Sequence, residues 1–368
     1  MSVLLVSPYF IDSYKNNLSM DSAVALARNL SKVMRVVVLT SGRTKEDEEL
    51  GENLRVVSTR GFLIPDPINY MISLGLLLRF VDLVRLVRPE VVVVSKFMFF
   101  SSLVIPLARL MKVPVITVTD TFPGINWFPV SKFASIIMWF YARIIGLPLL
   151  WMSDNVVLLY RGLIKVAKKY NLDYVVIPNG VEPIYFEKLP IPVDIKKPKD
   201  EFWVGFVGRP ESVKGYTQAL SIASDLQKYK NIKFVFVGGN RKVKVEKNKM
   251  FLGFRRDIMN IYQLFDVLIL PSHAEGLPNV VMQAMACEIP VVANAVGGVV
   301  ELIDNKRNGF LVELGDVKAM KRRILDLYRN EDLRVKIGKA ARETVKKDFN
   351  WSKILRDYQE LIKQVCAA

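Results

Sequence analysis

The sequence predicts an α/β protein of two domains, each built around a largely parallel β-sheet. Short apolar runs, such as residues 91–94 and 267–270, are typical of strands buried on both faces, and they alternate with segments of helical periodicity. The alternation occupies both halves of the 368 residues, and the Pro/Lys-rich stretch at residues 190–200 reads as a linker between them. Hydrophobic residues make up 51% of the chain, which is enough for two sizeable cores.

The first half opens with a strand, a helix and a second strand, which together predict a βαβ unit. Strands are expected at residues 3–6, 35–40, 54–58, 91–94, 113–118 and 155–159, helices at residues 21–34, 70–87 and 101–111, and residues 175–182 close the half. Asp120 follows the strand at residues 113–118. Because open α/β sheets bind ligands beyond the carboxyl ends of their strands, Asp120 is a site candidate. The alternative is a carboxylate that accepts hydrogen bonds in a turn or at a helix start.

An apolar segment at residues 133–151 is long enough to raise the question of a membrane span. Arg143, Gly146 and Pro148 interrupt it, and strands continue on both sides, so a helix lying in a membrane interface is the preferred interpretation. The segment is rich in aromatic side chains and adjoins a basic run. From Lys132 to Lys169 there are six basic residues, Lys132, Arg143, Arg161, Lys165, Lys168 and Lys169, against one acid, Asp154. This predicts docking on anionic lipid headgroups; the alternative is a core helix with a solvated basic neighbour.

The second half repeats the alternation. Strands are expected at residues 202–207, 233–237, 250–254, 267–270, 290–293 and 309–312, and helices at residues 219–227, 257–265, 278–287, 317–329, 331–345 and 353–365. Two cations, Arg209 and Lys214, lie in the loop after the first of these strands, GRPESVKG. Arginine can bind a phosphate in bidentate fashion and lysine acts as a point charge, so this pair can neutralise a diphosphate leaving group.

An acidic turn follows the strand at residues 267–270. Glu275 lies in this turn, and Pro278 suits the first position of the helix predicted at residues 278–287. The first N–H groups of a helix have no partner within it, so a helix start at the carboxyl edge of a parallel sheet is suited to bind an anion. Gly297 and Gly298, after the next strand, allow the backbone to pass close to a ligand.

These motifs resemble those of GT4-type retaining glycosyltransferases (glycosyl transferases group 1). GRPESVKG resembles the family pattern G-R-x-x-x-x-K-G, and the turn with Glu275 resembles the E-x7-E motif. The chain departs from the family at four points, one of which is Glu288 in place of the family's small residue after Cys287. Gln283 stands in place of the second Glu, the loop at residues 9–20 lacks the usual glycine pair, and Thr119-Asp120 stands where the family often has His-Asp.

The resemblance implies a GT-B fold, in which two Rossmann-like parallel-sheet domains face each other across a cleft and a C-terminal helix crosses back to the first domain. The implied division is an acceptor-side domain at residues 1–185, a linker at residues 186–200, a nucleotide-sugar-binding domain at residues 201–348 and the returning helix at residues 349–368.

The reaction implied is transfer of a sugar, with retention, from a nucleotide sugar to an acceptor hydroxyl. Arg209 and Lys214 would hold the diphosphate, Glu275 would hold donor-sugar hydroxyls, and Asp120 is the catalytic candidate of the first domain. The remaining implied donor-binding residues are Gly208, Phe254, Gly276, Leu277, Asn279, Val280, Gln283 and Glu301, with Gln283 at the ribose. The departing phosphate oxygen can accept the acceptor's proton, so we expect neither a metal nor another cofactor, and no metal-ligand cluster is evident.

Two other readings stay open. The missing glycine pair, the missing histidine and Gln283 favour a catalytically silent GT-B scaffold that binds a nucleotide sugar or a partner. A GT-B sugar-nucleotide epimerase is the other.

The net charge of +16 implies an anionic partner, either a nucleotide, a membrane surface or nucleic acid, although a basic surface without a partner is a fair alternative. Nucleic acid is least favoured, because no zinc-finger spacing, RNP-like motif or arginine-rich tail is present. We therefore expect a nucleotide sugar, a glycan or lipid-linked acceptor and peripheral contact with an anionic membrane. Two cysteines and no signal-peptide pattern predict a cytoplasmic protein, with membrane association open.

Overall fold

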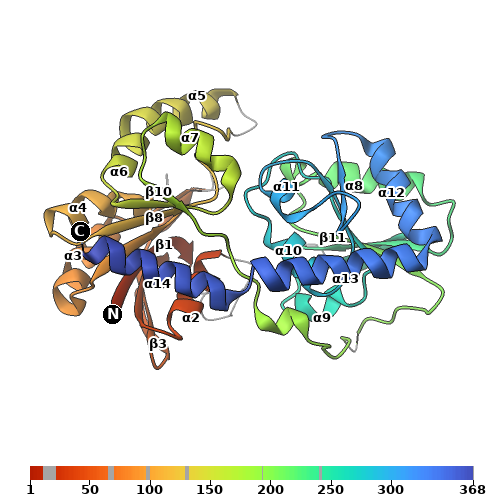
Figure 1. The fold of residues 1–368 in the computed structure, drawn as a ribbon, viewed down its shortest axis with the longest axis horizontal. Coiled ribbons are helices and arrows are strands. Elements are labelled where there is room, and N and C mark those ends of the chain that lie inside the picture. The colour runs from red at the N-terminus through yellow and green to blue at the C-terminus, as the bar shows by residue number, and fades with distance from the viewer. Residues whose placement is uncertain are drawn as a thin grey trace. The chain divides into compact units, whose positions relative to one another are not determined.

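The computed structural model describes residues 1–10, 22–64, 70–96, 100–128, 132–192, 194–239 and 243–367, and it confirms the predicted α/β class (Figure 1). The chain divides into two compact units, Met1–Asn179 with Trp351–Ala368, and Gly180–Asn350. The loop at residues 9–20, where the sequence lacks a glycine pair, lies almost wholly outside the described residues.

The first unit holds an eight-stranded sheet with the order β10-β9-β8-β7-β1-β2-β4-β3. Its strands are β1 (Ser2–Phe10), β2 (Arg35–Gly42), β3 (Glu46–Gly51), β4 (Leu54–Arg60), β7 (Val91–Ser95), β8 (Val115–Thr119), β9 (Asn155–Leu158) and β10 (Tyr174–Val176). Neighbouring strands are parallel except β3 and β4. The strand order reverses between β1 and β7, which is where open α/β sheets bind ligands.

Helices cover both faces of this sheet (Figure 1). They are α2 (Ser22–Leu30), α3 (Leu74–Val87), α4 (Val104–Leu110), α5 (Lys132–Tyr141), the π-helical turn η2 (Ala142–Gly146), α6 (Leu147–Trp151), α7 (Ile164–Lys169) and α14 (Trp351–Ala367). The C-terminal helix α14 contacts α2 and β7, so the end of the chain completes the first unit. Its buried face includes Ile354, Tyr358 and Ile362.

The predicted helix at residues 70–87 is shorter in the structure. Residues Tyr70–Ile72 instead form strand β6, which pairs with β5 (Phe62–Ile64) in an antiparallel hairpin. The Ser73 hydroxyl donates to the carbonyl of Arg60 over 2.9 Å, which ties the start of α3 to the end of β4. The hairpin was not predicted because the apolar residues keep a helical spacing from residue 70 onwards, and this spacing does not show where the helix begins.

The second unit holds a seven-stranded sheet with the order β13-β14-β12-β11-β15-β16-β17. Its strands are β11 (Phe202–Val207), β12 (Ile232–Val237), β13 (Lys244–Glu246), β14 (Lys249–Gly253), β15 (Val267–Leu270), β16 (Val291–Asn294) and β17 (Phe310–Val312). The helices are α8 (Tyr216–Asp225), α9 (Ile258–Tyr262), α10 (Asn279–Ala286), α11 (Val299–Leu302), α12 (Val317–Arg329) and α13 (Glu331–Asp348). Here the order reverses between β11 and β15, so the loops that follow these two strands start side by side.

Residues 180–200, which the sequence divides between the first domain and a linker, belong to the second unit. The amide of Leu189 donates to the side chain of Gln263 over 3.0 Å, and the Asn260 amide donates to the carbonyl of Pro190 over 2.7 Å. Asp194 forms an ion pair with Arg255 at 2.5 Å. Polar side chains of the α9 region therefore hold a segment whose composition alone is typical of a free linker.

Candidate active site

The candidate site is built on the loops that follow β11 and β15, which are parallel neighbours in the sheet. The amide of His273 donates to the carbonyl of Val213 over 2.8 Å, which joins the two loops through their backbones. Gly215 has φ +69°, and a Cβ there would lie 2.1 Å from the carbonyl oxygen of Pro271. Only glycine allows so close an approach, so Gly215 brings the cationic loop against the acidic turn.

Lys214 and Glu275 meet at this junction. The Lys214 Nζ atom lies 3.0 Å from Oε1 and 2.9 Å from Oε2 of Glu275, and the Glu275 side chain is only 7% exposed. A lysine ammonium has three N–H donors. Two of them reach the Glu275 carboxylate, so the third can still donate to a ligand. The structure thus brings together two of the predicted catalytic residues, from loops 61 residues apart in sequence.

Arg209 is the more exposed cation. Its guanidinium pairs with Glu211 at 2.8 Å while 58% of its side chain is exposed. Gly208, directly before it, ends β11 with its amide donating to the carbonyl of Val237 over 2.9 Å. Gly208 therefore fixes the backbone from which Arg209 projects, and an exposed ion pair leaves that side chain free to turn.

The glycine pair after β16 contacts the acidic turn. The amide of Gly298 donates to the carbonyl of Gly276 over 2.8 Å, and a Cβ on Gly297 would lie 1.8 Å from the carbonyl oxygen of Glu275. The close approach predicted from these glycines is therefore an approach to the protein's own backbone. It holds the acidic turn at Glu275, whereas Gly215 contacts the chain at Pro271, before the turn.

Helix α10 begins directly after the acidic turn, with Pro278 as its N-cap. The Val281 amide donates to the Pro278 carbonyl over 3.1 Å, so the amides of Asn279 and Val280 precede the first hydrogen bond of the helix. Leu277 is buried, so a ligand would meet its backbone and not its side chain. This is the predicted arrangement for an anion site, and anion binding there stays a prediction.

Gln283 faces the interior of the second unit. It is 3% exposed, and its Oε1 atom accepts a hydrogen bond from the Tyr262 hydroxyl over 3.1 Å. Burial raises the pKa of Tyr262 well above its ordinary value, so this hydroxyl keeps its proton and remains a donor. A ribose contact by Gln283 stays a prediction, and it would use the amide nitrogen.

Phe254 follows β14 and is 54% exposed, so its ring is accessible at the edge of the sheet. The neighbouring Arg255, which the sequence leaves either at a nucleotide base or solvated, forms ion pairs with Asp194 and Asp257. These two carboxylates raise the pKa of Arg255 above its ordinary value. Arg255 thus holds the segment at residue 194 on the second unit.

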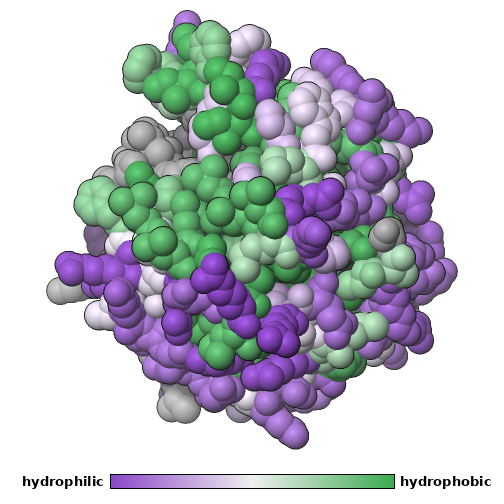
Figure 2. All heavy atoms as spheres, turned by 90° about the vertical axis from the view of Figure 1, so that its left-hand side faces the viewer, coloured by the Kyte–Doolittle hydropathy of each residue, from purple (hydrophilic) through white to green (hydrophobic). Residues whose placement is uncertain are grey.

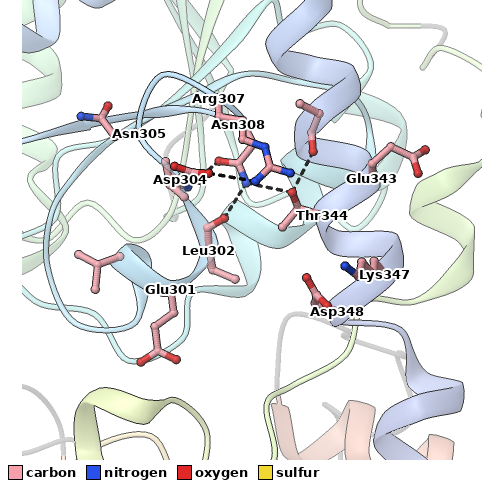
Figure 3. A pocket seen from close by; sticks show the side chains of 13 residues that line it. Glu301, Leu302, Asp304, Asn305, Arg307, Asn308, Glu343, Thr344, Lys347 and Asp348 are labelled. Carbon is pink, nitrogen blue, oxygen red and sulfur yellow. Dashed lines mark hydrogen bonds and ion pairs between the residues drawn. The ribbon is translucent and has the colours of Figure 1, made fainter.

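Glu301 lines a separate cavity of about 600 Å³, whose lining includes residues of α11, of the loop that follows it and of α13 but neither Lys214 nor Glu275 (Figure 3). Figure 3 shows the Glu301 carboxylate pointing away from the hydrogen-bonded group around Asn308. The Asn308 amide donates to the carbonyl of Leu302 and to the hydroxyl of Thr344, and its oxygen accepts from the amide of Asp304. These hydrogen bonds stabilise the loop. The predicted contact of Glu301 with a nucleotide sugar stays a prediction.

Asp120 lies in the first unit, directly after β8. Its carboxylate is 3.9 Å from the Nζ atom of Lys96, which directly follows the neighbouring strand β7. Lys96 has φ +64°, a left-handed conformation that is uncommon for residues other than glycine. Sequence reasoning did not single out Lys96, although its place after a wholly apolar strand is the same signal that drew attention to Asp120.

No group of three or more His, Cys, Asp or Glu side chains that could hold a metal ion occurs among the described residues. His273, the one histidine of the sequence, lies 2.5 Å from the side-chain amide of Gln218 through its ring Nε2. This contact joins the acidic turn to α8.

Several of these site residues lie in a segment that matches a known protein family. The family model for glycosyl transferases group 1 matches residues 188–344, which include Arg209, Lys214, Glu275 and Gln283. A curated relative, the capsular polysaccharide biosynthesis glycosyltransferase CapM of Staphylococcus aureus, is 29% identical over 181 residues, covering 45% of this chain and 48% of the relative. The chain thus spans about half the length of that relative.

Solved structures match the fold over nearly the whole chain. A sucrose-phosphate synthase from Thermosynechococcus elongatus superposes with a TM-score of 0.79 at 18% identity, covering 100% of this chain and 99% of the other. HepE of Anabaena, in complex with UDP-glucose, gives a TM-score of 0.71 at 16% identity, covering 99% of this chain and 100% of the other. At these identities the likeness concerns the fold, and it confirms the predicted GT-B class with two Rossmann-like domains. Residues 188–344, a little under half of this chain, thus match the glycosyl transferases group 1 family.

Proposed function

We propose that this chain is a glycosyltransferase that moves a sugar from a nucleoside diphosphate sugar to an acceptor hydroxyl, with retention of the anomeric configuration. The observation that carries the proposal is the contact between Lys214 and Glu275 at the adjoining ends of β11 and β15. A cation that binds a diphosphate and a carboxylate that binds sugar hydroxyls are the two groups that a sugar nucleotide requires next to each other.

In the proposed complex, Lys214 donates its third N–H to the diphosphate while it holds Glu275 in place. Arg209 leaves Glu211 and turns to the same diphosphate, which its exposure permits. The backbone N–H groups at the start of α10 donate further hydrogen bonds to the diphosphate and carry no net charge. Together these groups stabilise the negative charge that develops on the leaving group, so the proposed chemistry needs no resident metal ion.

The proposed reaction proceeds on one face of the sugar. The bond between the anomeric carbon and the diphosphate oxygen breaks, the acceptor oxygen bonds to the anomeric carbon from the same side, and the departing phosphate oxygen takes the acceptor's proton. This step requires no histidine, which agrees with threonine preceding Asp120. For the acceptor we propose a lipid-linked or membrane-proximal glycan, since the first unit carries an exposed apolar helix.

The test is a transfer assay with purified protein, a panel of nucleotide sugars and lipid-linked and soluble glycan acceptors. We expect a glycoside product whose anomeric configuration, read by NMR, equals that of the donor, and we expect Glu275→Gln to abolish it. Binding of a nucleotide sugar without transfer to any acceptor would instead support a silent scaffold. Product formed without an acceptor would identify an epimerase.

A further inference from the structure

The first unit carries an exposed apolar helix that takes no part in the proposed chemical step of sugar transfer. Residues Lys132–Trp151, comprising α5, η2 and α6, are long and apolar enough to cross a membrane by length and composition. None of the residues of α5 is buried. Phe133, Ile136, Ile137, Phe140 and Ile144 are between 53% and 75% exposed. Their spacing places them on one face of the helix.

The opposite face of this helix packs on the first unit. A Cβ on Gly124 would lie 2.3 Å from the carbonyl oxygen of Met138 and 2.8 Å from the Ala142 side chain, so the backbones are in close contact there. Arg143 donates to the carbonyl of Gly124 over 3.1 Å. Leu149 belongs to the hydrophobic core of the unit. The helix is therefore anchored along its length, and it would have to leave the fold to span a bilayer.

Basic side chains adjoin the exposed apolar face. The indole of Trp151, 56% exposed at the end of α6, donates to the carbonyl of Tyr170 over 2.8 Å, which places α7 and its C-terminal end beside the apolar helix. Arg161, Lys165, Lys168 and Lys169, on α7 and the turn before it, are all exposed. The single acid between Lys132 and Lys169, Asp154, is held by Arg109 and by the amide of Val115.

Figure 2 views the first unit from the side. Apolar side chains gather at its top, where α5 lies in Figure 1, and across its middle. An apolar face next to a cluster of exposed basic side chains complements a bilayer with anionic headgroups. A second copy of the chain would bring the same basic α7 against itself, which like-charge repulsion disfavours.

We propose that α5, η2 and α6 lie in the interface of an anionic lipid bilayer, with the apolar stripe in the acyl boundary and the lysines of α7 at the headgroups. This docking goes beyond sugar transfer and would bring a membrane-borne acceptor to the protein. Its test uses vesicles without nucleotide sugar, whereas transfer to a soluble acceptor is measured without vesicles. Failure of one proposal is thus distinguishable from failure of the other.

The experiment is flotation of the full chain with vesicles of phosphatidylcholine, alone or mixed with phosphatidylglycerol, at low and high salt. We expect binding to the anionic vesicles that weakens with salt, since salt screens the headgroup charge. Ile137→Asp with Ile144→Asp, and separately Lys165→Glu with Lys168→Glu, should each reduce the partition coefficient roughly tenfold or more.

Two matched controls carry the same changes on exposed positions of the second unit. They are Val245→Asp with Leu314→Asp, and Lys230→Glu with Lys318→Glu, and both should bind like the wild type. Circular dichroism and size-exclusion chromatography check that every variant is folded. The proposal is overturned if the wild type binds no vesicles, if the α5 and α7 variants bind as well as the controls, or if the α5 changes only dissolve a dimer of the chain.

Discussion

The ammonium of Lys214 and the carboxylate of Glu275 form a two-point contact of 3.0 and 2.9 Å between loops that follow neighbouring parallel strands. Close backbone approaches hold the two loops there, of Gly215 to Pro271 and of Gly297 to Glu275. Lys214 need not leave Glu275 when a ligand binds, since its ammonium keeps a third N–H donor available. It is the geometry on which the proposed donor site rests.

Replacing Lys214 by glutamine should weaken binding of a nucleoside diphosphate. A hydrogen bond to a charged group contributes about 2 kcal/mol, so we expect Kd to rise roughly thirtyfold. Isothermal titration calorimetry with UDP measures this. The control is Lys321→Gln, which removes an exposed ion pair with Asp225 in the same unit. Equal affinity of Lys214→Gln and Lys321→Gln would contradict a diphosphate site at Lys214.

Gly297→Ala should lower the free energy of unfolding much more than Gly315→Ala does. Both glycines have positive φ, but an added Cβ at Gly297 meets the Glu275 carbonyl at 1.8 Å, whereas at Gly315 it meets nothing within 4 Å. We expect about 1 kcal/mol of lost stability for Gly315→Ala from backbone strain, and at least about 2 kcal/mol more for Gly297→Ala. Urea denaturation measures both. Similar losses would show that the contact with the acidic turn is not tight.

Much of the second unit could be predicted from the sequence because its strands are continuous apolar runs. The expected ranges 202–207 and 267–270 coincide with β11 and β15, and the expected helix 317–329 coincides with α12. Short apolar runs bounded by turn residues are typical of parallel strands buried on both faces. The family resemblance implied that Lys214 and Glu275 serve one donor, and in the structure they meet because their loops follow neighbouring parallel strands.

Elements held by tertiary contacts could not be predicted in this way. Strand β3, EDEELG, is acidic and has no apolar run, and it forms because it pairs antiparallel with β4 at the sheet edge. There Asp47 pairs with Arg55 at 2.7 Å, and this hydrogen bond lowers the pKa of the carboxyl. The burial of Gln283 could not be predicted either, since helical periodicity does not show which polar side chain forms a buried hydrogen bond, as Gln283 does with Tyr262.

Gln283→Glu, which restores the family's residue, should destabilise the protein. Burial raises the pKa of a carboxyl at this position, so ionisation favours the unfolded chain and the cost grows as pH rises above about 4.3, the ordinary glutamate value. We expect a loss of about 1 to 3 kcal/mol at pH 7 that shrinks towards pH 4. Gln227→Glu is the exposed control. An equal effect of both changes, by urea denaturation, would contradict the buried placement of Gln283.

The Cys287 thiol should make the protein sensitive to alkali. Burial raises its pKa from an ordinary value near 9 to about 12, and its Sγ donates to the carbonyl of Tyr185 over 3.3 Å. Because the folded pKa is the higher one, this stability is fully present below about pH 9 and is lost as pH rises towards 12, by at most about 1.4 kcal/mol per pH unit.

Urea denaturation between pH 8 and 10 measures this slope before the buried tyrosines Tyr262 and Tyr358 contribute, since the ordinary tyrosine pKa is near 10. Cys287→Ala should flatten the slope, and Cys366→Ala, at an exposed thiol, should change it far less. An alkaline slope unchanged by Cys287→Ala would show that another group is responsible.

Asp120→Asn should lower turnover without changing donor affinity. Asp120 belongs to the first unit, whereas Lys214 and Glu275 belong to the second, so a nucleoside diphosphate should bind the variant as it binds the wild type. If the carboxylate contacts the reacting groups, its loss should reduce kcat by about a hundredfold. Steady-state transfer kinetics and calorimetry separate the two effects, with the exposed Asp82→Asn as the control. Unchanged kcat in Asp120→Asn would assign this carboxylate to the turn after β8, where it already accepts from the Thr121 hydroxyl and faces Lys96.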